Sequence, residues 1–200
     1  MQTKFDASCL PDAQLLCIMN FCFYRLLRIG NVSIPNSEKW DANRILTRQD
    51  IQRTFNGFIL NIRSSKTIQF RQRVFQAVIP KFPGHPHCPT AALESFLTRV
   101  GPLPGSYPAL AYRRPDNALV VPHTPRVRKL LSNLFVKMGL SSKDYNTHSL
   151  RRSGATHLLS VGVPVDMIKI LADWKSDCVF KYLKPSPDTK LTVAKSFSQS

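Results

Sequence analysis

The chain is organised around residues 147–183, which read THSLRRSGATHLLSVGVPVDMIKILADWKSDCVFKYL. Thr147 can cap a helix whose apolar positions continue to Gly162. His148 and Arg151 are three residues apart and therefore share one face of the first helical turn. This face combines a proton-transfer group with a planar guanidinium that can bind two phosphate oxygens, so the stretch is the first candidate for a functional site.

Beyond a break at 162–164, the same stretch predicts a second short helix and then a third segment with two aromatic residues. The apolar residues that predict the helix are Val165, Ile168, Ile170 and Leu171. The aromatic residues are Trp174 and Tyr182. A protonated tyrosine, with an unperturbed pKa of about 10, is a poor nucleophile, so a tyrosine near Arg, Lys and His indicates covalent chemistry on a phosphodiester. Taken singly, each aromatic residue is better explained as a packing residue.

The charge of the chain indicates a polyanionic partner. Lys and Arg number 28 against 12 Asp and Glu, which gives a net charge of +16 and a pI of about 10.1. Such a balance over one domain is typical of nucleic-acid binding. A membrane surface fits less well, because the basic residues are spread along the chain and no apolar run approaches the roughly 20 residues of a membrane span.

The cysteines indicate a reducing compartment. Their number is odd and their spacing irregular, and Cys17 and Cys22 fall in an apolar helical pattern, which predicts buried free thiols. The N-terminus lacks the charged start and long apolar core of a signal peptide. We therefore expect an intracellular protein, in the nucleus if the host is eukaryotic and otherwise in the cytoplasm.

The N-terminal part predicts one long helix that begins at Pro11 and ends at Gly30. Arg28 falls in its last predicted turn. For a lone arginine, an interaction with the helix C-terminus is a sufficient explanation.

A small antiparallel sheet is predicted next. Strands at 51–55 and 58–63 flank Asn56-Gly57, a pair that suits the positive φ angles of a type I′ turn, and a third strand is expected at 74–79. Lys66 then lies in the connection between the second and third strands. A lone lysine in such a loop is usually solvated.

Two further segments have open interpretations. His85, His87 and Cys88 invite a zinc site, but a fourth ligand at recognisable spacing is missing, so we favour a plain loop before a helix capped by Thr90. A short extended pair is expected at 109–112 and 119–121. A helix from Thr124 to Gly139 then carries basic residues that either contact DNA backbone or form a solvated face; they are Arg126, Arg128, Lys129 and Lys137.

Several of these residues, in order, resemble the catalytic half of the tyrosine recombinase (phage integrase) family, and most closely its eukaryotic, retroelement-type members. The matching features are Leu27-Arg28, Lys66 in Ser-Lys-Thr, His148-x-x-Arg151, Gly154-Ala155-Thr156, Trp174 and Tyr182. The resemblance implies that Arg28, Lys66, His148, Arg151 and Trp174 surround a scissile DNA phosphate. Tyr182 would attack this phosphate and become linked to the DNA 3′-phosphate.

Two departures from the family pattern are visible. Many members carry an acidic residue three positions after the first arginine, where this chain has Asn31. An amide can still hold an arginine through a hydrogen bond. In many members the counterpart of Trp174 precedes the tyrosine by nine positions, and here the gap from 174 to 182 is eight.

The resemblance also implies a fold and partners. We expect a mainly α-helical α+β fold with a small three-stranded antiparallel sheet, one catalytic domain over 1–185 without the family's N-terminal DNA-clamping domain, and a disordered tail at 186–200. Expected partners are double-stranded DNA and further copies of the chain in a synaptic tetramer on DNA, and no metal or nucleotide cofactor is required. Two alternatives stay open: a non-catalytic DNA-binding module, and a nickase similar to type IB topoisomerases.

Overall fold

The structure is a computed structural model that describes residues 6, 9–35, 40–64, 73–141, 144–174, 187 and 190–191. Its helices are α1 (Leu10–Tyr24), α2 (Ile29–Val32), the 3₁₀ helix η1 (Arg48–Asp50), α3 (Pro89–Val100), α4 (Thr124–Lys137), α5 (Thr147–Ser160) and α6 (Val165–Ala172). Its strands are β1 (Ile51–Thr54), β2 (Gly57–Ile62), β3 (Phe75–Pro80), β4 (Tyr112–Arg113) and β5 (Leu119–Val120). The expected α+β fold, mainly helical with a small three-stranded antiparallel sheet, is confirmed.

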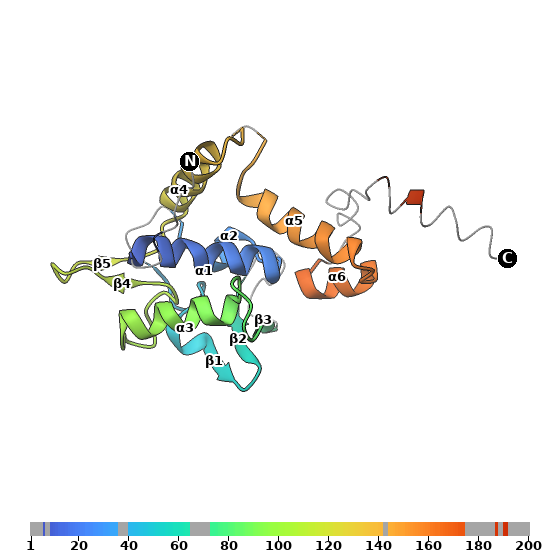
Figure 1. The fold of residues 1–200 in the computed structure, drawn as a ribbon. Helices are drawn as coiled ribbons and strands as arrows, with labels where there is room; N and C mark the ends of the chain where they lie inside the picture. Colours follow the sequence, from blue (N-terminus) through green and yellow to red (C-terminus); the bar gives the residue numbers. More distant parts are fainter. Residues whose placement is uncertain are drawn as a thin grey trace.

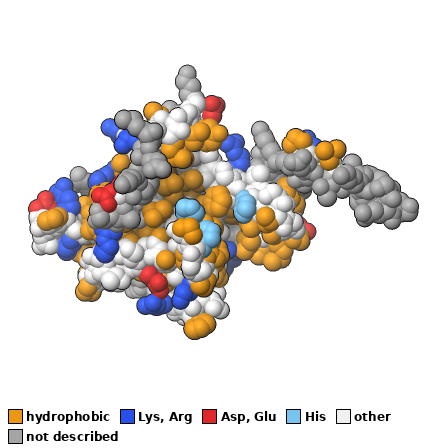
Figure 2. All heavy atoms as spheres, in the orientation of Figure 1, with side chains coloured by type: hydrophobic (Ala, Val, Ile, Leu, Met, Phe, Trp, Pro, Cys, Tyr) orange, Lys and Arg blue, Asp and Glu red, His pale blue; other side chains and the backbone are white. Residues whose placement is uncertain are grey.

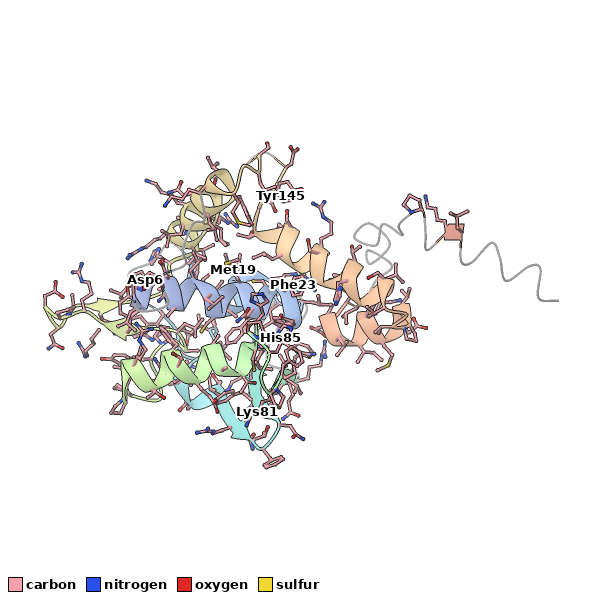
Figure 3. All side chains as sticks on the ribbon, viewed as in Figure 1. Asp6, Met19, Phe23, Lys81, His85 and Tyr145 are labelled. Carbon is pink, nitrogen blue, oxygen red and sulfur yellow. The ribbon has the colours of Figure 1, made fainter. Side chains whose placement is uncertain are left out.

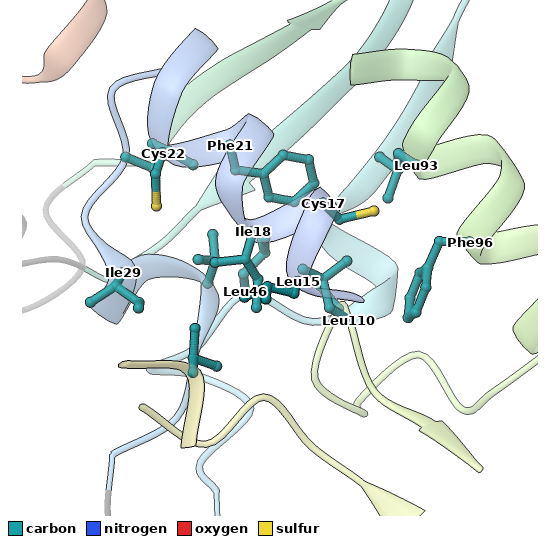
Figure 4. Packing of buried hydrophobic residues seen from close by; sticks show 14 of the residues in the cluster. Leu15, Cys17, Ile18, Phe21, Cys22, Ile29, Leu46, Leu93, Phe96 and Leu110 are labelled. Carbon is teal, nitrogen blue, oxygen red and sulfur yellow. The ribbon is translucent and has the colours of Figure 1, made fainter. Parts of the chain in front are cut away.

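Helix α1 lies at the centre of the molecule, with α3 on one side and α5 on another (Figure 1). Pro11 stands in its first turn, where a missing backbone N–H costs nothing. Apolar side chains then surround the helix on most sides, as expected of a helix that is buried all round. Phe21 and Ile18 are fully buried in this core, together with Phe96 of α3 (Figure 4).

Helix α1 ends at Tyr24, so the predicted single helix to Gly30 is wrong. Leu26 has a φ of 53°, a left-handed conformation that turns the chain, and its side chain is 1% exposed. Arg28 is the N-cap of the short helix α2 and not part of the last turn of α1. The turn contains no Gly or Pro. Burial of the Leu26 side chain stabilises it instead.

The three-stranded sheet has the order β1-β2-β3 and is antiparallel throughout. Thr54 pairs with Gly57, so the hairpin loop is Phe55-Asn56, one residue earlier than predicted. Only Gly57 in this loop region has a positive φ, of 135°, so the predicted type I′ turn is wrong. The third strand begins and ends one residue later than predicted.

Helix α3 packs between α1 and the sheet, and Cys88 is its N-cap rather than the predicted Thr90. The Cys88 Sγ accepts hydrogen bonds from the backbone N–H groups of Ala91 and Phe82. The Thr90 hydroxyl instead donates to the backbone oxygens of Ile79 and Pro80 and so joins α3 to β3. The short pair β4–β5 confirms the segment predicted at 119–121, whereas the segment predicted at 109–112 is a strand only from Tyr112, because residues 109 and 110 form a turn.

Helices α4, α5 and α6 confirm the three helices predicted in the C-terminal half, with corrections at their ends. The buried stripe of α4 is Val127, Leu131 and Phe135, whereas Met138, which caps the helix C-terminus, is 59% exposed. Helix α5 begins at Thr147, which is its first residue and not its cap. In α6, Ile168 is fully buried.

The buried apolar residues form two clusters. The larger one joins α1, α3, α4 and the sheet, and it includes Phe21, Leu60, Leu93, Phe96 and Leu131. The smaller one lies between the α1–α2 turn, α5 and α6. Its buried members are Leu26, Ala155, Ile168, Ala172 and Trp174.

The cysteines at 9, 17, 22 and 88 are free thiols. Cys17 and Cys22 are buried, as predicted, and burial raises the pKa of each to about 12. Among the described helices, none has both the length and the hydropathy needed to cross a bilayer.

Candidate active site

Three of the six predicted site residues line one cavity of about 240 Å³: Arg28, His148 and Arg151. Arg28 comes from the turn between α1 and α2, and the other two come from the first turns of α5. More than a hundred residues separate Arg28 from His148 along the chain. The fold therefore brings together two guanidinium groups and one imidazole, a combination suited to an anion that must also exchange a proton.

Arg28 is half-buried, and Asn31 holds it through the backbone. The Arg28 N–H donates to the Asn31 Oδ1 at 2.9 Å, and the Asn31 N–H donates to the Arg28 carbonyl oxygen at 2.8 Å. The predicted hydrogen bond from Asn31 to the arginine therefore exists, but its donor is the main chain and not the guanidinium. The amide fixes the backbone of Arg28 at the start of α2, and Arg28 lines the cavity.

The start of α5 is held by Asn146, whose Oδ1 accepts a hydrogen bond from the His148 N–H at 2.8 Å. In return, the Asn146 N–H donates to the Ser149 Oγ at 3.0 Å. This reciprocal cap satisfies two backbone groups at the helix end and stabilises the turn that carries His148. The cap is therefore Asn146, one residue before the predicted Thr147.

Arg151 is held from behind by the end of α6. Its side chain is 3% exposed, and its Nη2 donates to the Ala172 carbonyl oxygen at 2.7 Å. Its Cζ lies 4.8 Å from the centre of the Trp174 ring. Trp174 thus contacts Arg151 and does not line the cavity; it lines a separate hollow of about 430 Å³ that also includes Arg73 and Asp173.

The pKa of His148 is lowered below its usual value. Partial removal of the ring from solvent is the main cause, followed by the positive charges of Arg151, Arg128 and Arg28. A lowered pKa keeps the imidazole neutral at neutral pH. In this state the ring can accept a proton from a neighbouring hydroxyl.

Gly154 allows α5 to approach α1 closely. A Cβ at this position would lie 2.1 Å from the backbone oxygen of Phe23 and 2.7 Å from the Leu26 Cδ2. No other residue type fits without a shift of one helix against the other. The contact fixes the distance between the α5 face with Arg151 and the turn that leads to Arg28.

Lys66 and Tyr182, the other two predicted site residues, lie outside the described residues, as do most positions of the predicted tail. The described chain resumes after Lys66 at Arg73, whose guanidinium forms an ion pair with Asp173. Asp173 directly precedes Trp174 and caps α6 in a left-handed conformation with a φ of 52°. This ion pair joins the start of the third strand to the segment that holds Arg151.

Sequence reasoning did not single out Arg128, which lines the cavity from α4. Helical spacing puts Arg128 three residues before the buried Leu131, at the edge of the stripe that faces the core. That position separates it from its basic neighbours on α4. The sequence alone does not fix which edge of α4 faces His148.

A second group of histidines lies away from this cavity. Figure 2 shows histidine side chains gathered on one face of the molecule. The ring of His85 (Figure 3) lies 6.0 Å from that of Phe82, which lies 5.5 Å from the ring of Tyr24 at the end of α1. The rings of His85 and His87 are 5.7 Å apart, and that of His157 is 6.2 Å from Phe23. Within the described part of the chain, no three His, Cys, Asp or Glu side chains are placed to hold a metal ion.

Comparison with known proteins gives structural matches only. No protein-family model and no curated protein sequence matches the chain. Solved structures that match include the XerA recombinase, with a TM-score of 0.63 and 18% identity over 99% of this chain and 62% of that one. The XerH site-specific recombinase, in a post-cleavage complex with its palindromic difH substrate, gives a TM-score of 0.64 and 14% identity over 96% of this chain and 47% of that one.

A third match is the Tn1549 transposon integrase in complex with a circular intermediate DNA, with a TM-score of 0.50 and 11% identity over 91% of this chain and 58% of that one. This chain thus spans between about half and two thirds of the length of these neighbours. Their identities are low, so the matches concern the fold. They show that the chain has the α+β fold of the catalytic domain of tyrosine recombinases.

Proposed function

We propose that this chain cleaves and rejoins DNA strands through a covalent 3′-phosphotyrosine intermediate, in the recombination or integration of a mobile element. The observation that carries this proposal is the cavity shared by Arg28, His148 and Arg151. Phosphoryl transfer requires positive charge at the non-bridging oxygens of the phosphorus, and two arginines supply it at any working pH.

The first step then forms one bond and breaks one. The Tyr182 oxygen attacks the phosphorus, its proton passes to the neutral His148, and the bond from phosphorus to the 5′-oxygen breaks. Lys66 gives a proton to the leaving 5′-oxygen. In rejoining, a 5′-hydroxyl attacks the phosphotyrosine and the protons return, so no energy source is needed.

The roles of Lys66 and Tyr182 rest on the sequence resemblance. In this proposal Trp174 acts by holding Arg151 in place, whereas the resemblance implies a position beside the phosphate itself.

Double-stranded DNA is the proposed partner. The net charge of +16 supports it, and the XerH and Tn1549 neighbours were solved as DNA complexes. We also propose that copies of the chain associate on DNA, since exchange of strands between two duplexes requires several active sites. A retroelement-type origin is proposed from the sequence resemblance alone.

The experiment that tests the proposal uses nicked suicide duplexes, in which the cleaved end diffuses away and the covalent adduct accumulates. A denaturant-resistant protein–DNA adduct is expected for the unmodified chain. Tyr182→Phe removes only the attacking oxygen, so it should abolish the adduct while DNA affinity changes by no more than about two-fold.

Tyr107→Phe is the matched control and should still form adduct, because Tyr107 packs against Trp40, away from the cavity. DNA binding without any adduct would indicate a DNA-binding module. Adduct and relaxation of supercoils without exchange between duplexes would indicate a nickase similar to type IB topoisomerases. Adduct formation by the Tyr182→Phe protein would overturn the assignment of the nucleophile.

A further inference from the structure

Two hollows meet at Arg128. The cavity with Arg28 and Arg151 has a neighbour of about 290 Å³, and both are lined by Arg128, Thr147 and His148. Arg128 therefore stands on the ridge between the proposed place of the scissile phosphate and a second depression. A DNA strand that enters the first hollow and leaves through the second must pass this guanidinium.

We propose that Arg128 binds the phosphate next to the scissile phosphate on the cleaved strand, with the intervening deoxyribose in the second hollow. This assignment rests on the proposed function, because it takes the first cavity as the place of cleavage. It adds a DNA-binding residue that the sequence resemblance does not include.

The lining of the second hollow suits a sugar better than another phosphate. Besides the three shared residues, it includes Leu131, Ser132 and Tyr145. Tyr145 lies in the segment between α4 and α5 (Figure 3), is 40% exposed, and has its ring 6.0 Å from that of Phe135. The Ser132 hydroxyl and the apolar surfaces of Leu131 and Tyr145 suit a deoxyribose. The positive charge at this hollow comes from Arg128, at its border with the first cavity.

Arg128 is also suited to a phosphate by what surrounds it. Its side chain is exposed, and within the described part of the chain no carboxylate forms an ion pair with it. Arg126, two residues earlier on α4, lies on another face of the helix, because successive residues are about 100° apart around the helix axis. The two arginines therefore form a matched pair: the same helix, the same charge, and different faces.

The test uses suicide duplexes in which one phosphate at a time is replaced by an uncharged methylphosphonate. On the all-phosphate duplex, we expect Arg128→Gln to slow adduct formation by about ten-fold or more, in line with the loss of one charge-assisted contact. When the phosphate that Arg128 binds is replaced in the duplex, adduct formation by the unmodified chain should slow by a similar factor. Arg128→Gln should then cause no further loss, as in a double-mutant cycle of a single contact.

Arg126→Gln and Lys129→Gln are the controls. Each removes one positive charge from α4, as Arg128→Gln does. A loss of rate caused only by the lower overall charge should therefore be equal in all three variants and on every duplex. Circular dichroism should show all three variants folded, and Arg128→Lys should recover part of the rate because it restores charge without the planar fork.

Three outcomes would overturn the assignment. Arg128→Gln could behave like Arg126→Gln, it could couple to neither flanking phosphate, or it could couple only to the scissile phosphate. If the unmodified chain forms no adduct on any duplex, the proposed function itself fails, and this result is separate from the other three.

Discussion

The large and the small hydrophobic clusters stabilise different parts of this molecule. The large cluster connects regular elements whose apolar faces are long and continuous, such as α1 and α3. The small cluster has five buried members and lies between a turn, α5 and α6. Arg151 packs on Trp174 and donates to Ala172, both of which belong to the small cluster.

The difference indicates that global stability and site geometry depend on separate sets of contacts. Loss of a large side chain in the large cluster should lower the free energy of unfolding and leave the folded site intact. Smaller changes in the small cluster should displace Arg28 or Arg151 with a modest loss of stability. Substitutions at three positions test this separation, beginning with the one of largest expected effect on unfolding.

Phe96→Ala should lower the free energy of unfolding by about 3–5 kcal/mol, because the fully buried ring fills the space between α3 and α1. Urea unfolding followed by circular dichroism measures this loss. Phe55→Ala is the matched control: Phe55 is 94% exposed, so its removal should change stability by no more than about 0.5 kcal/mol. At low temperature, adduct formation per folded molecule should be unchanged in both variants, and a strong loss of rate in folded Phe96→Ala would contradict the separation.

Gly154→Ala should lower the free energy of unfolding by about 1–3 kcal/mol, because the added Cβ meets a backbone oxygen that cannot turn aside. It should also slow adduct formation in the folded protein, since α5 must move away from the turn before Arg28. Unfolding and suicide-substrate kinetics on the same samples separate the two effects.

Gly30→Ala is the control for stability, because a Cβ there has nothing within 4 Å and the residue has no positive φ. If Gly154→Ala were as stable and as fast as the unmodified chain, the close approach of α5 to α1 would not position the site.

Much of the large cluster could be predicted from the sequence. The alternation of the three strands and the helical spacing of α3 and α4 are local patterns, so their positions agree within a few residues. The starts of two helices are predicted less accurately, because residues other than the predicted ones act as their caps. Cys88 caps α3 through its sulfur, and Asn146 caps α5 one residue before the Thr147 that seemed sufficient.

The small cluster could not be predicted in the same way. The turn at Leu26 has no Gly or Pro, and what stabilises it is contact with residues more than a hundred positions away, including Ala155 and Trp174. Arg28, His148 and Arg151 line one cavity, and their spacing along the chain contains no information on this arrangement. The same holds for Arg128, whose place in the cavity becomes defined only when α4 packs against α1.

The smallest predicted effect is a difference in stability between two substitutions of Leu26, with glycine more stable than alanine. Both Leu26→Ala and Leu26→Gly remove the side chain from the small cluster, and both should be destabilised relative to the unmodified chain. An L-residue with a φ of 53° is strained by roughly 1–2 kcal/mol, and glycine is not. Leu26→Gly should therefore be more stable than Leu26→Ala by about 1 kcal/mol in urea unfolding.

The same pair of substitutions at Leu158, inside α5, provides the control, because there alanine should be the more stable by about 0.5–1 kcal/mol. If alanine were preferred at both positions, the left-handed turn at Leu26 would be absent in solution. A preference for glycine at Leu26 alone, with slow adduct formation in both Leu26 variants, would show that the chain accepts backbone strain at this turn. The strained leucine would then be the link between the small cluster and Arg28, two residues further along.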